Sequence, residues 1–371
     1  MAYSMNSATT LEPAAVSADP AALAARPVRQ RIAEDKAMLK AAADLTRDLN
    51  VPKPVIYWSD LIVSVAIGYG ALVAAMLVPS VGWAIAAGVV AALALYRAES
   101  FIHELTHIKH AAVPGFRLGW NLLVGIPLLT PSFMYEGVHN LHHAKTRYGT
   151  VEDPEYLPLA LMKWWSLPVF LLVAALAPVA LLFRYAVLTP LSVVIPSLRR
   201  HVVERLSGLQ INPSFRRAAP DGPARALWHR LEAAASVYAI ALITLTATGV
   251  IPLKAFLVFL AVTSALAVTN QVRTLVAHLW ENEGEPMTVT EQYLDSVNVP
   301  PPAFLPMLWA PVGLRYHALH HLLPGLPYHA LGTAHRRIMA ALEPDSPYHK
   351  GNYRGLPFLA TRLAASTCKR R

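Results

Sequence analysis

The chain has 371 residues, of which 55% are hydrophobic and only 15% are charged. Long apolar runs with so little charge are typical of an integral membrane protein and argue against two soluble domains. The formal net charge of +9 comes from basic residues that lie between the apolar runs, which predicts loops on the cytoplasmic side of a membrane and no nucleic-acid partner.

The N-terminal part of the chain precedes any apolar run. Residues 1–27 are rich in Ala, Ser and Pro without a long apolar core, which predicts a disordered arm and not a signal peptide. Residues 29–47 have the spacing of a basic amphipathic helix. This helix could lie on a membrane surface or pack on the protein, and the sequence favours neither. We therefore predict an arm and a helix over residues 1–54, followed by a membrane domain over residues 55–340.

The first hairpin begins at residue 57. Residues 57–79 form an apolar run that would be about 35 Å long as a helix, which is enough to span a bilayer. Residues 80–82 predict a tight turn, and residues 83–96 predict a return helix that continues into His103. At the helical rise, His103 and His107 then lie about 6 to 12 Å beyond the hydrocarbon edge. The sequence thus predicts histidines beside the membrane and not within it.

The next apolar stretch, residues 116–135, connects the first histidine cluster to the second. It contains Pro127 and Pro131, which interrupt a helix. Ligands of one metal site must lie on one face of the membrane, so this stretch cannot cross the bilayer once. We predict a re-entrant or in-plane segment that packs against the protein.

Residues 164–198 are also apolar, but a charge and several prolines interrupt them, among them Arg184, Pro168, Pro178 and Pro190. Residues 199–230 follow with seven arginines and are predicted to be cytoplasmic. The apolar stretch therefore crosses the membrane twice or not at all. A charge is unfavourable at the bilayer centre, so we predict an interfacial, hairpin-like excursion.

A second hairpin is predicted from residues 232–250 and 254–270, which are joined by a short turn. Its return helix continues to His278 and so repeats the geometry of the first hairpin. The chain after this point is charged or rich in proline and contains no further span. Residues 300–314 are expected to skim the membrane interface, and residues 341–371 are predicted to be a basic tail.

Nine histidines carry the chemistry. They form an HxxxH pair, two HxxHH clusters and one single position: His103 and His107; His139, His142 and His143; His317, His320 and His321; and His278. Positions i, i+3 and i+4 share one face of a helix, so each cluster can direct its imidazoles to a single point. Neutral imidazole is a common ligand of iron, zinc and copper. The sequence therefore predicts a metal site built from all nine side chains.

The motifs HELTH (103–107), HNLHH (139–143) and HALHH (317–321) resemble the histidine boxes of the membrane fatty-acid desaturase and hydroxylase superfamily. The resemblance covers roughly residues 55–340. It implies two iron ions held by the nine histidines, with His278 as the ligand outside the boxes. It also implies an all-α integral membrane protein, in which two transmembrane helical hairpins and interfacial helices carry a cytoplasmic di-iron domain. In the acyl-CoA branch an asparagine lies four residues before the ninth histidine, whereas this chain has Thr274.

The resemblance implies an O2-dependent oxidoreductase that acts on a lipid, and the composition favours a bacterial inner membrane. Desaturation of a fatty-acyl chain is the favoured reaction; hydroxylation or ketolation of a lipid, alkane or carotenoid is the alternative. Electrons would come from an external donor, such as a ferredoxin or a cytochrome with its reductase, since Cys368 is the single cysteine and cannot hold an iron–sulfur cluster. The HELTH motif also fits the HExxH pattern, which leaves an intramembrane metalloprotease as a remote alternative.

Further side chains could orient the imidazoles or line a substrate tunnel. The candidates for orienting hydrogen bonds are Glu104, Glu136, Glu152, Asp153, Glu281 and Asn282. The candidate tunnel residues, which are equally ordinary core or interface aromatics, are Trp120, Tyr135, Trp280 and Tyr316. The histidines expected to be structural or at the surface are His110, His201, His229, His329, His335 and His349.

Overall fold

The computed structural model describes residues 31–303 and 305–368. Residues 33 onward form one compact unit, and the predicted arm over residues 1–27 lies outside the described residues. Within the described ranges the chain is helical throughout, and its extended pairings are isolated bridges without a named strand. The predicted all-α fold is confirmed.

The longer helices are α2 (Lys36–Thr46), α3 (Pro54–Leu77), α4 (Val81–Glu99), α5 (Phe101–His107), α6 (Phe116–Trp120), α7 (His139–His142), α8 (Ser166–Phe183), α9 (Thr189–Val194), α10 (Pro196–Leu206), α11 (Gly222–Ala247), α12 (Leu253–Leu275), α13 (Val289–Asp295), α14 (Pro306–Trp309), α15 (His317–Leu322), α16 (Leu331–Ala341) and α17 (Leu356–Cys368). Short 3-10 turns lie between them, and π-helical turns occupy η3 (Asn121–Gly125) and η6 (Arg184–Leu188).

Helix α2 confirms part of the predicted amphipathic helix, which begins later than expected. Residues 31–35 are not helical, because the Asp35 side chain caps the helix by accepting a hydrogen bond from the Met38 amide at 2.9 Å. Met38 and Ala42 are buried in one core cluster with Ala334 and Ile338 of α16. This face of α2 therefore packs on the protein, one of the two alternatives that the sequence left open.

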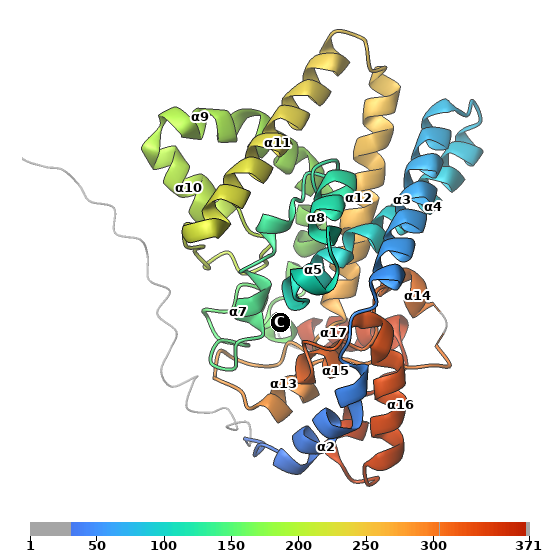
Figure 1. The fold of residues 1–371 in the computed structure, drawn as a ribbon, viewed down its shortest axis with the longest axis vertical. Helices are drawn as coiled ribbons and strands as arrows, with labels where there is room; N and C mark the ends of the chain where they lie inside the picture. Colours follow the sequence, from blue (N-terminus) through green and yellow to red (C-terminus); the bar gives the residue numbers. More distant parts are fainter. Residues whose placement is uncertain (1–30, 304, 369–371) are drawn as a thin grey trace, which may run out of the picture. The chain divides into compact units, whose positions relative to one another are not determined.

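Two helical hairpins organise the membrane part, as predicted. The first consists of α3 and α4, and the second of α11 and α12; all four helices are long and apolar enough to cross a membrane. In Figure 1 the turns of both hairpins lie at the upper end, away from α7, α13 and α15. The Lys254 ammonium donates to the Val78 carbonyl at 3.4 Å, which brings the two turns together. Helix α11 begins at Gly222, well before the predicted start at residue 232.

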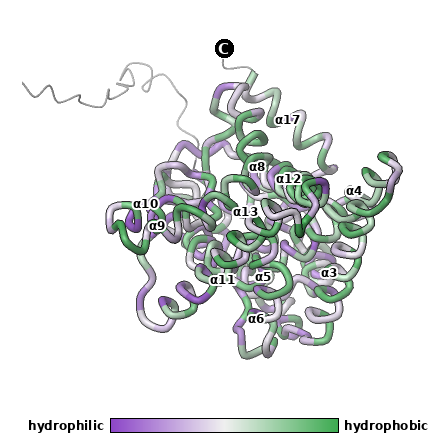
Figure 2. Tube along the Cα trace, turned by 90° about the horizontal axis from the view of Figure 1, so that it is seen from above, coloured by the Kyte–Doolittle hydropathy of each residue, from purple (hydrophilic) through white to green (hydrophobic). Residues whose placement is uncertain are grey.

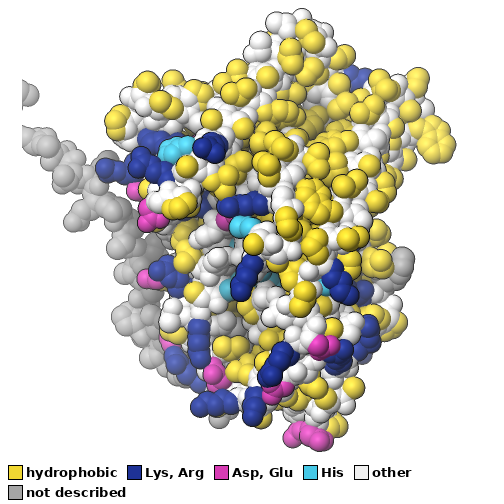
Figure 3. Space-filling view, viewed as in Figure 1, with side chains coloured by type: hydrophobic (Ala, Val, Ile, Leu, Met, Phe, Trp, Pro, Cys, Tyr) yellow, Lys and Arg dark blue, Asp and Glu magenta, His cyan; other side chains and the backbone are white. Residues whose placement is uncertain are grey.

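Hydrophobic side chains on the hairpins face outward. Ile67, Trp83 and Val89 are large and apolar, yet each of them is half exposed or more. Figure 3 shows apolar side chains over the hairpins, whereas Lys, Arg, Asp and Glu gather on the lower part, which contains α2 and α16, and at the left beside α10. The tube coloured by hydropathy shows the same apolar character along α3 and α4 (Figure 2). An exposed apolar belt of this kind is the surface that a bilayer covers, and the protein is an integral membrane protein.

The stretch over residues 116–135 forms no spanning helix, as predicted. It consists of the short α6, the π-helical turn η3 and a 3-10 turn at Ser132–Met134. The Asn121 side chain holds the segment together, because it accepts from the Ser132 amide at 2.9 Å and donates to the Arg117 carbonyl at 2.8 Å. Two of its backbone polar groups are thus satisfied within the protein.

Residues 164–198, predicted to make an interfacial, hairpin-like excursion, contain a long helical run. The run 166–194 is helical throughout and is long and apolar enough to cross a membrane by itself, with Pro178 inside α8. The charge that seemed to exclude a long helix is neutralised, because Arg184 forms an ion pair with Glu232 at 2.7 Å and both side chains are buried. The sequence pattern could not reveal this pairing between positions so far apart.

The stretch nevertheless leaves and re-enters the same region. Ser166 and Gln210 line one cavity, and the Ile211 amide donates to the Pro154 carbonyl at 3.0 Å. Helices α9 and α10 provide the return path between them. The excursion therefore begins and ends beside the histidine clusters.

Candidate metal centre

The nine predicted histidines lie together, in two groups. The first group has five members, and the second has four: His103, His107, His139, His143 and His320; and His142, His278, His317 and His321. Within each group every residue offers one ring nitrogen, and these nitrogens all lie within 4.8 Å of one another. Among the described residues, these two groups are the clusters with the geometry to hold a metal ion.

Each HxxHH cluster serves both groups, which corrects the expectation that a cluster points to a single site. On α7 and the residue after it, the i and i+4 histidines, His139 and His143, belong to the first group, whereas His142 belongs to the second. On α15 the assignment is reversed: His317 and His321 belong to the second group and His320 to the first. The two helices thus tie the two groups of histidines together.

Backbone pairings position the third cluster. The Asn298 side chain accepts from the Leu319 amide at 3.0 Å, and the Val297 carbonyl accepts from the Ala318 amide at 3.2 Å. Asn298 is fully buried, so these bonds are shielded from water and fix the start of α15. The histidines of α15 are themselves buried, which holds their rotamers.

His278 lies just beyond α12, and the helix does not continue to it as predicted. Helix α12 ends at Leu275, and the Leu279 amide donates to the Asp295 carbonyl at 2.7 Å. Trp280 follows with φ of 60°, a left-handed conformation that a bulky residue adopts only when the surroundings enforce it. The sharp turn after the helix brings the ring of His278 to the second group.

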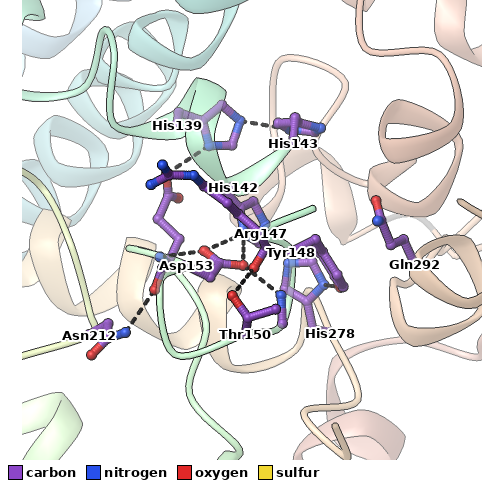
Figure 4. A network of polar contacts seen from close by, with 12 residues as sticks. His139, His142, His143, Arg147, Tyr148, Thr150, Asp153, Asn212, His278 and Gln292 are labelled. Atoms are coloured by element: carbon purple, nitrogen blue, oxygen red, sulfur yellow. Dashed lines mark hydrogen bonds and ion pairs between the residues drawn. The ribbon is translucent and has the colours of Figure 1, made fainter. Parts of the chain in front are cut away.

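Two carboxylates hold the second cluster, and only one of them was predicted. Asp153 accepts from Nδ1 of His142 at 2.9 Å and from the Gly149 amide at 2.9 Å. Glu155 accepts from Nδ1 of His139 at 2.8 Å and from the Tyr135 hydroxyl at 2.9 Å. Figure 4 shows the Asp153 contacts together with the pair His139 and His143. With Nδ1 engaged in this way, Nε2 of each ring is left free to bind a metal.

A tyrosine and a serine hold His278, and sequence reasoning missed both. The ring Nδ1 donates to the Tyr148 oxygen at 2.8 Å and lies 3.2 Å from the Ser296 hydroxyl. Tyr148 in turn donates to Asp295 at 2.9 Å. The position of Tyr148 and Glu155 in the loop after the second cluster could have indicated this role, since a loop that follows a histidine-bearing helix can fold back on it.

The other predicted orienting residues are engaged elsewhere. Glu104 accepts from the Tyr57 hydroxyl and the Tyr328 amide; Glu136 pairs with Arg117; and Glu281 pairs with Arg362. Glu152 is mostly exposed, and Asn282 donates to the Gly149 and Glu285 carbonyls. The six remaining histidines lie outside both groups, as predicted.

The ring nitrogens are suited to a metal by their lack of other partners. Nε2 of His143 lies 3.0 Å from Nε2 of His139 and 3.1 Å from Nε2 of His320. One proton can bridge only one of these pairs, whereas a cation can accept all three lone pairs. Both ring nitrogens of His103 and Nε2 of His107 are buried without a hydrogen-bond partner among the described residues. Such orphaned polar atoms are unfavourable unless a ligand satisfies them.

The protonation of the site also fits a metal. Burial and the neighbouring imidazoles lower the pKa of His143, His320 and His321 well below the ordinary value, so these rings are neutral and can donate a lone pair. Burial also lowers the pKa of His142, but the Asp153 carboxylate outweighs it and the net shift is upward. Burial raises the pKa of Glu155 to about 7.

A cavity of about 750 Å³ opens beside the first group. Its wall includes His103, Tyr135 and Glu155, and it continues between apolar faces of α8 and α12. This volume is within the usual range of a ligand pocket. Of the candidate tunnel residues Tyr135 lines the cavity; Trp120 and Trp280 are core residues, and Tyr316 packs with His335.

Comparisons with known proteins agree with this geometry. The profile of the family described as "Fatty acid desaturase" matches residues 78–352. A protein of Caulobacter vibrioides (strain NA1000 / CB15N) described as "Ceramide hydroxylase" is 50% identical over 326 residues, which cover 88% of this chain and 93% of that protein. No solved structure gives a significant match. The preference for desaturation is not confirmed, since this relative is a hydroxylase.

Proposed function

Because the chain belongs to the fatty acid desaturase family, we propose that this membrane oxidoreductase is an O2-dependent hydroxylase of ceramide or a closely related long-chain amide lipid. The observation that carries the proposal is the 50% identity to a ceramide hydroxylase along nearly the whole of both chains. The sequence alone left hydroxylation as the alternative to desaturation. The identity to this relative favours hydroxylation.

The proposed cofactor is a pair of iron ions, one in each histidine group. The split of nine imidazoles into a group of five and a group of four supports two ions, because nine ligands exceed what one ion can bind. When bound, iron would supply the activation of O2 that oxidation of a C–H bond requires. The chain itself supplies the neutral imidazoles, their orientation by Asp153, Glu155 and Tyr148, and a largely apolar cavity that excludes water from the reacting carbon.

The site is proposed to face the cytoplasm of a bacterium, with electrons delivered by an external ferredoxin or a cytochrome and its reductase. The basic loops support this orientation, since positively charged loops remain on the cytoplasmic side. Among the described residues the lone cysteine, Cys368, is exposed near the end of α17 and far along the chain from every histidine group. The protein therefore needs a separate electron carrier for each turnover.

The reaction is tested in a host that makes ceramide and has compatible electron carriers. We expect lipid mass spectrometry to show a ceramide that has gained one oxygen atom, and labelled O2 should be the source of that atom. The His143→Ala variant should make none, because it removes a ligand of the first group. A product that has lost two hydrogens without gaining oxygen would show that the enzyme is a desaturase.

The membrane orientation is tested by cysteine labelling in a Cys368→Ser background. A cysteine at Ser80, in the exposed turn of the first hairpin, should react with an impermeant maleimide in intact cells. A cysteine at Asp221, exposed just before α11, should react only after permeabilisation. Labelling of both positions from outside would contradict the proposal that residues 199–230 and the histidine groups share the cytoplasmic face.

The HExxH alternative has no support in the geometry. A metalloprotease of this type needs the glutamate of the motif beside the metal-bound water. Glu104 is instead buried against Tyr57 and the Tyr328 amide, and the two histidines of the motif join seven others.

The second candidate function is desaturation of a lipid chain, which the family's description supports.

A further inference from the structure

Arg273 is an unusual residue in the wall of the cavity. It lies in the last turn of α12 and lines the cavity together with Asn270 and Thr274. Its Nη2 donates to the Asn270 side chain at 3.3 Å, and the Tyr96 hydroxyl lies beside it. Its Nε is buried without a hydrogen-bond partner in the part of the chain that the structure describes. Both of these neighbours are neutral. The Glu155 carboxyl lines the same cavity within electrostatic reach of Arg273, but no ion pair joins the two among the described residues.

No ion pair neutralises Arg273 among the described residues. Arg184 provides the contrast. Its guanidinium forms an ion pair with Glu232 and donates a hydrogen bond to the Ser207 hydroxyl. A guanidinium carries donors only, so an unused buried donor requires an acceptor. An ionisable side chain in a membrane protein that faces a cavity without such a partner is a binding residue by default. The acceptor must therefore come from a molecule that enters the cavity.

The position of Arg273 is close to the metal groups. It lines the same cavity as His103 of the first group. A molecule that binds Arg273 in this cavity therefore lies beside the histidines.

The cavity offers a further polar group on α4. Glu99 of α4 also lines the cavity, where its carboxyl accepts from the Thr130 hydroxyl at 2.9 Å. Farther along, the walls are Val173, Ala177 and Leu266, which offer no polar contact. A lipid that carries an amide has both a carbonyl acceptor and N–H or O–H donors at one end and an apolar chain at the other. The cavity lining includes both kinds of group, polar side chains and apolar faces of α8 and α12.

We propose that Arg273 binds the amide carbonyl of the lipid and thereby places a carbon near the polar head, and not a carbon in the middle of a chain, at the metal centre. Glu99 receives the donor groups of the same head, and the chain extends between α8 and α12. This assignment rests on the proposed function and adds the part of the substrate that is recognised and the region that is oxidised.

Binding of a short-chain ceramide to the purified full-length protein tests the assignment without turnover. We expect Arg273→Leu to raise the Kd about tenfold or more, where each factor of ten corresponds to about 1.4 kcal/mol, and Arg273→Lys to be intermediate. A ceramide analogue whose carbonyl is reduced to a methylene should bind the wild type as weakly as ceramide binds Arg273→Leu. Metal content and melting temperature should stay at wild-type values. Arg362→Leu, which removes a surface arginine outside the cavity, should bind ceramide normally.

The location of the new oxygen is the second measurement. Fragmentation of the product should place it within a few bonds of the amide. Equal affinity of the wild type for ceramide and its reduced analogue would overturn the assignment, as would an oxygen in the distal half of a chain. If the wild type neither binds nor hydroxylates ceramide, the proposed function fails as well. If it hydroxylates ceramide and Arg273→Leu does so with unchanged KM, only the role of Arg273 is refuted.

Discussion

Replacing His278 or His103 by alanine should abolish turnover, but each variant should lose a different ion. His278 belongs to the group of four and His103 to the group of five, and neither lies in a cluster that serves both groups. Removal of an orienting residue beside a metal ligand typically lowers affinity or activity about 10- to 100-fold, so loss of a ligand itself should exceed that range. Elemental analysis of iron-replete protein should give about two ions for the wild type and about one for each variant.

His320→Ala should have a wider effect than either of these. Its own ring belongs to the first group, but α15 also carries His317 and His321 of the second. A disturbed α15 should therefore release both ions. His110→Ala is the matched control, because its side chain is partly exposed, contacts Glu136 and belongs to neither group. A wild type that holds one ion, or single variants that retain both, would contradict the dinuclear arrangement.

The gathering of the nine histidines could be predicted from the sequence because it depends largely on local spacing. Eight of the nine histidines lie in three short clusters, where i, i+3 and i+4 positions are neighbours whatever the rest of the fold does. The hairpins were predictable for a similar reason, since an apolar run of sufficient length has few alternatives in a bilayer. The distribution of each HxxHH cluster over two groups was not predictable, because it depends on where the facing helix lies.

Long-range pairings account for the errors. Arg184 appeared incompatible with a long apolar helix until Glu232 of α11 was found beside it. Glu155 and Tyr148 were missed because their contacts with His139 and His278 depend on how the loop after α7 folds back. Glu281 and Glu136 are close to the histidines in sequence, but they pair with Arg362 and Arg117 instead. Sequence separation alone does not say which acid approaches which histidine.

Asp153→Ala should reduce metal retention and activity about 10- to 100-fold, the range found when a carboxylate behind a ligand histidine is removed. Asp153 is fully buried and joins three elements of the site: it accepts from His142 and from the Gly149 and Glu155 amides. Without it, the ring of His142 loses its tautomer and orientation, and the loop that carries Glu155 loses its anchor. The loss should therefore reach both metal groups.

Glu152 provides the matched control for this prediction, since it is the preceding residue and carries the same charge. Its side chain is 66% exposed and lies 3.7 Å from Arg147, a surface pair that contributes little. Competition with a chelator, followed by elemental analysis, should show normal retention in Glu152→Ala and weakened retention in Asp153→Ala. Asp153→Asn should be intermediate, because an amide oxygen can still accept the His142 proton but carries no charge to hold it. Equal metal retention in the two alanine variants would mean that the burial of His142, and not the Asp153 carboxylate, holds the second group in place.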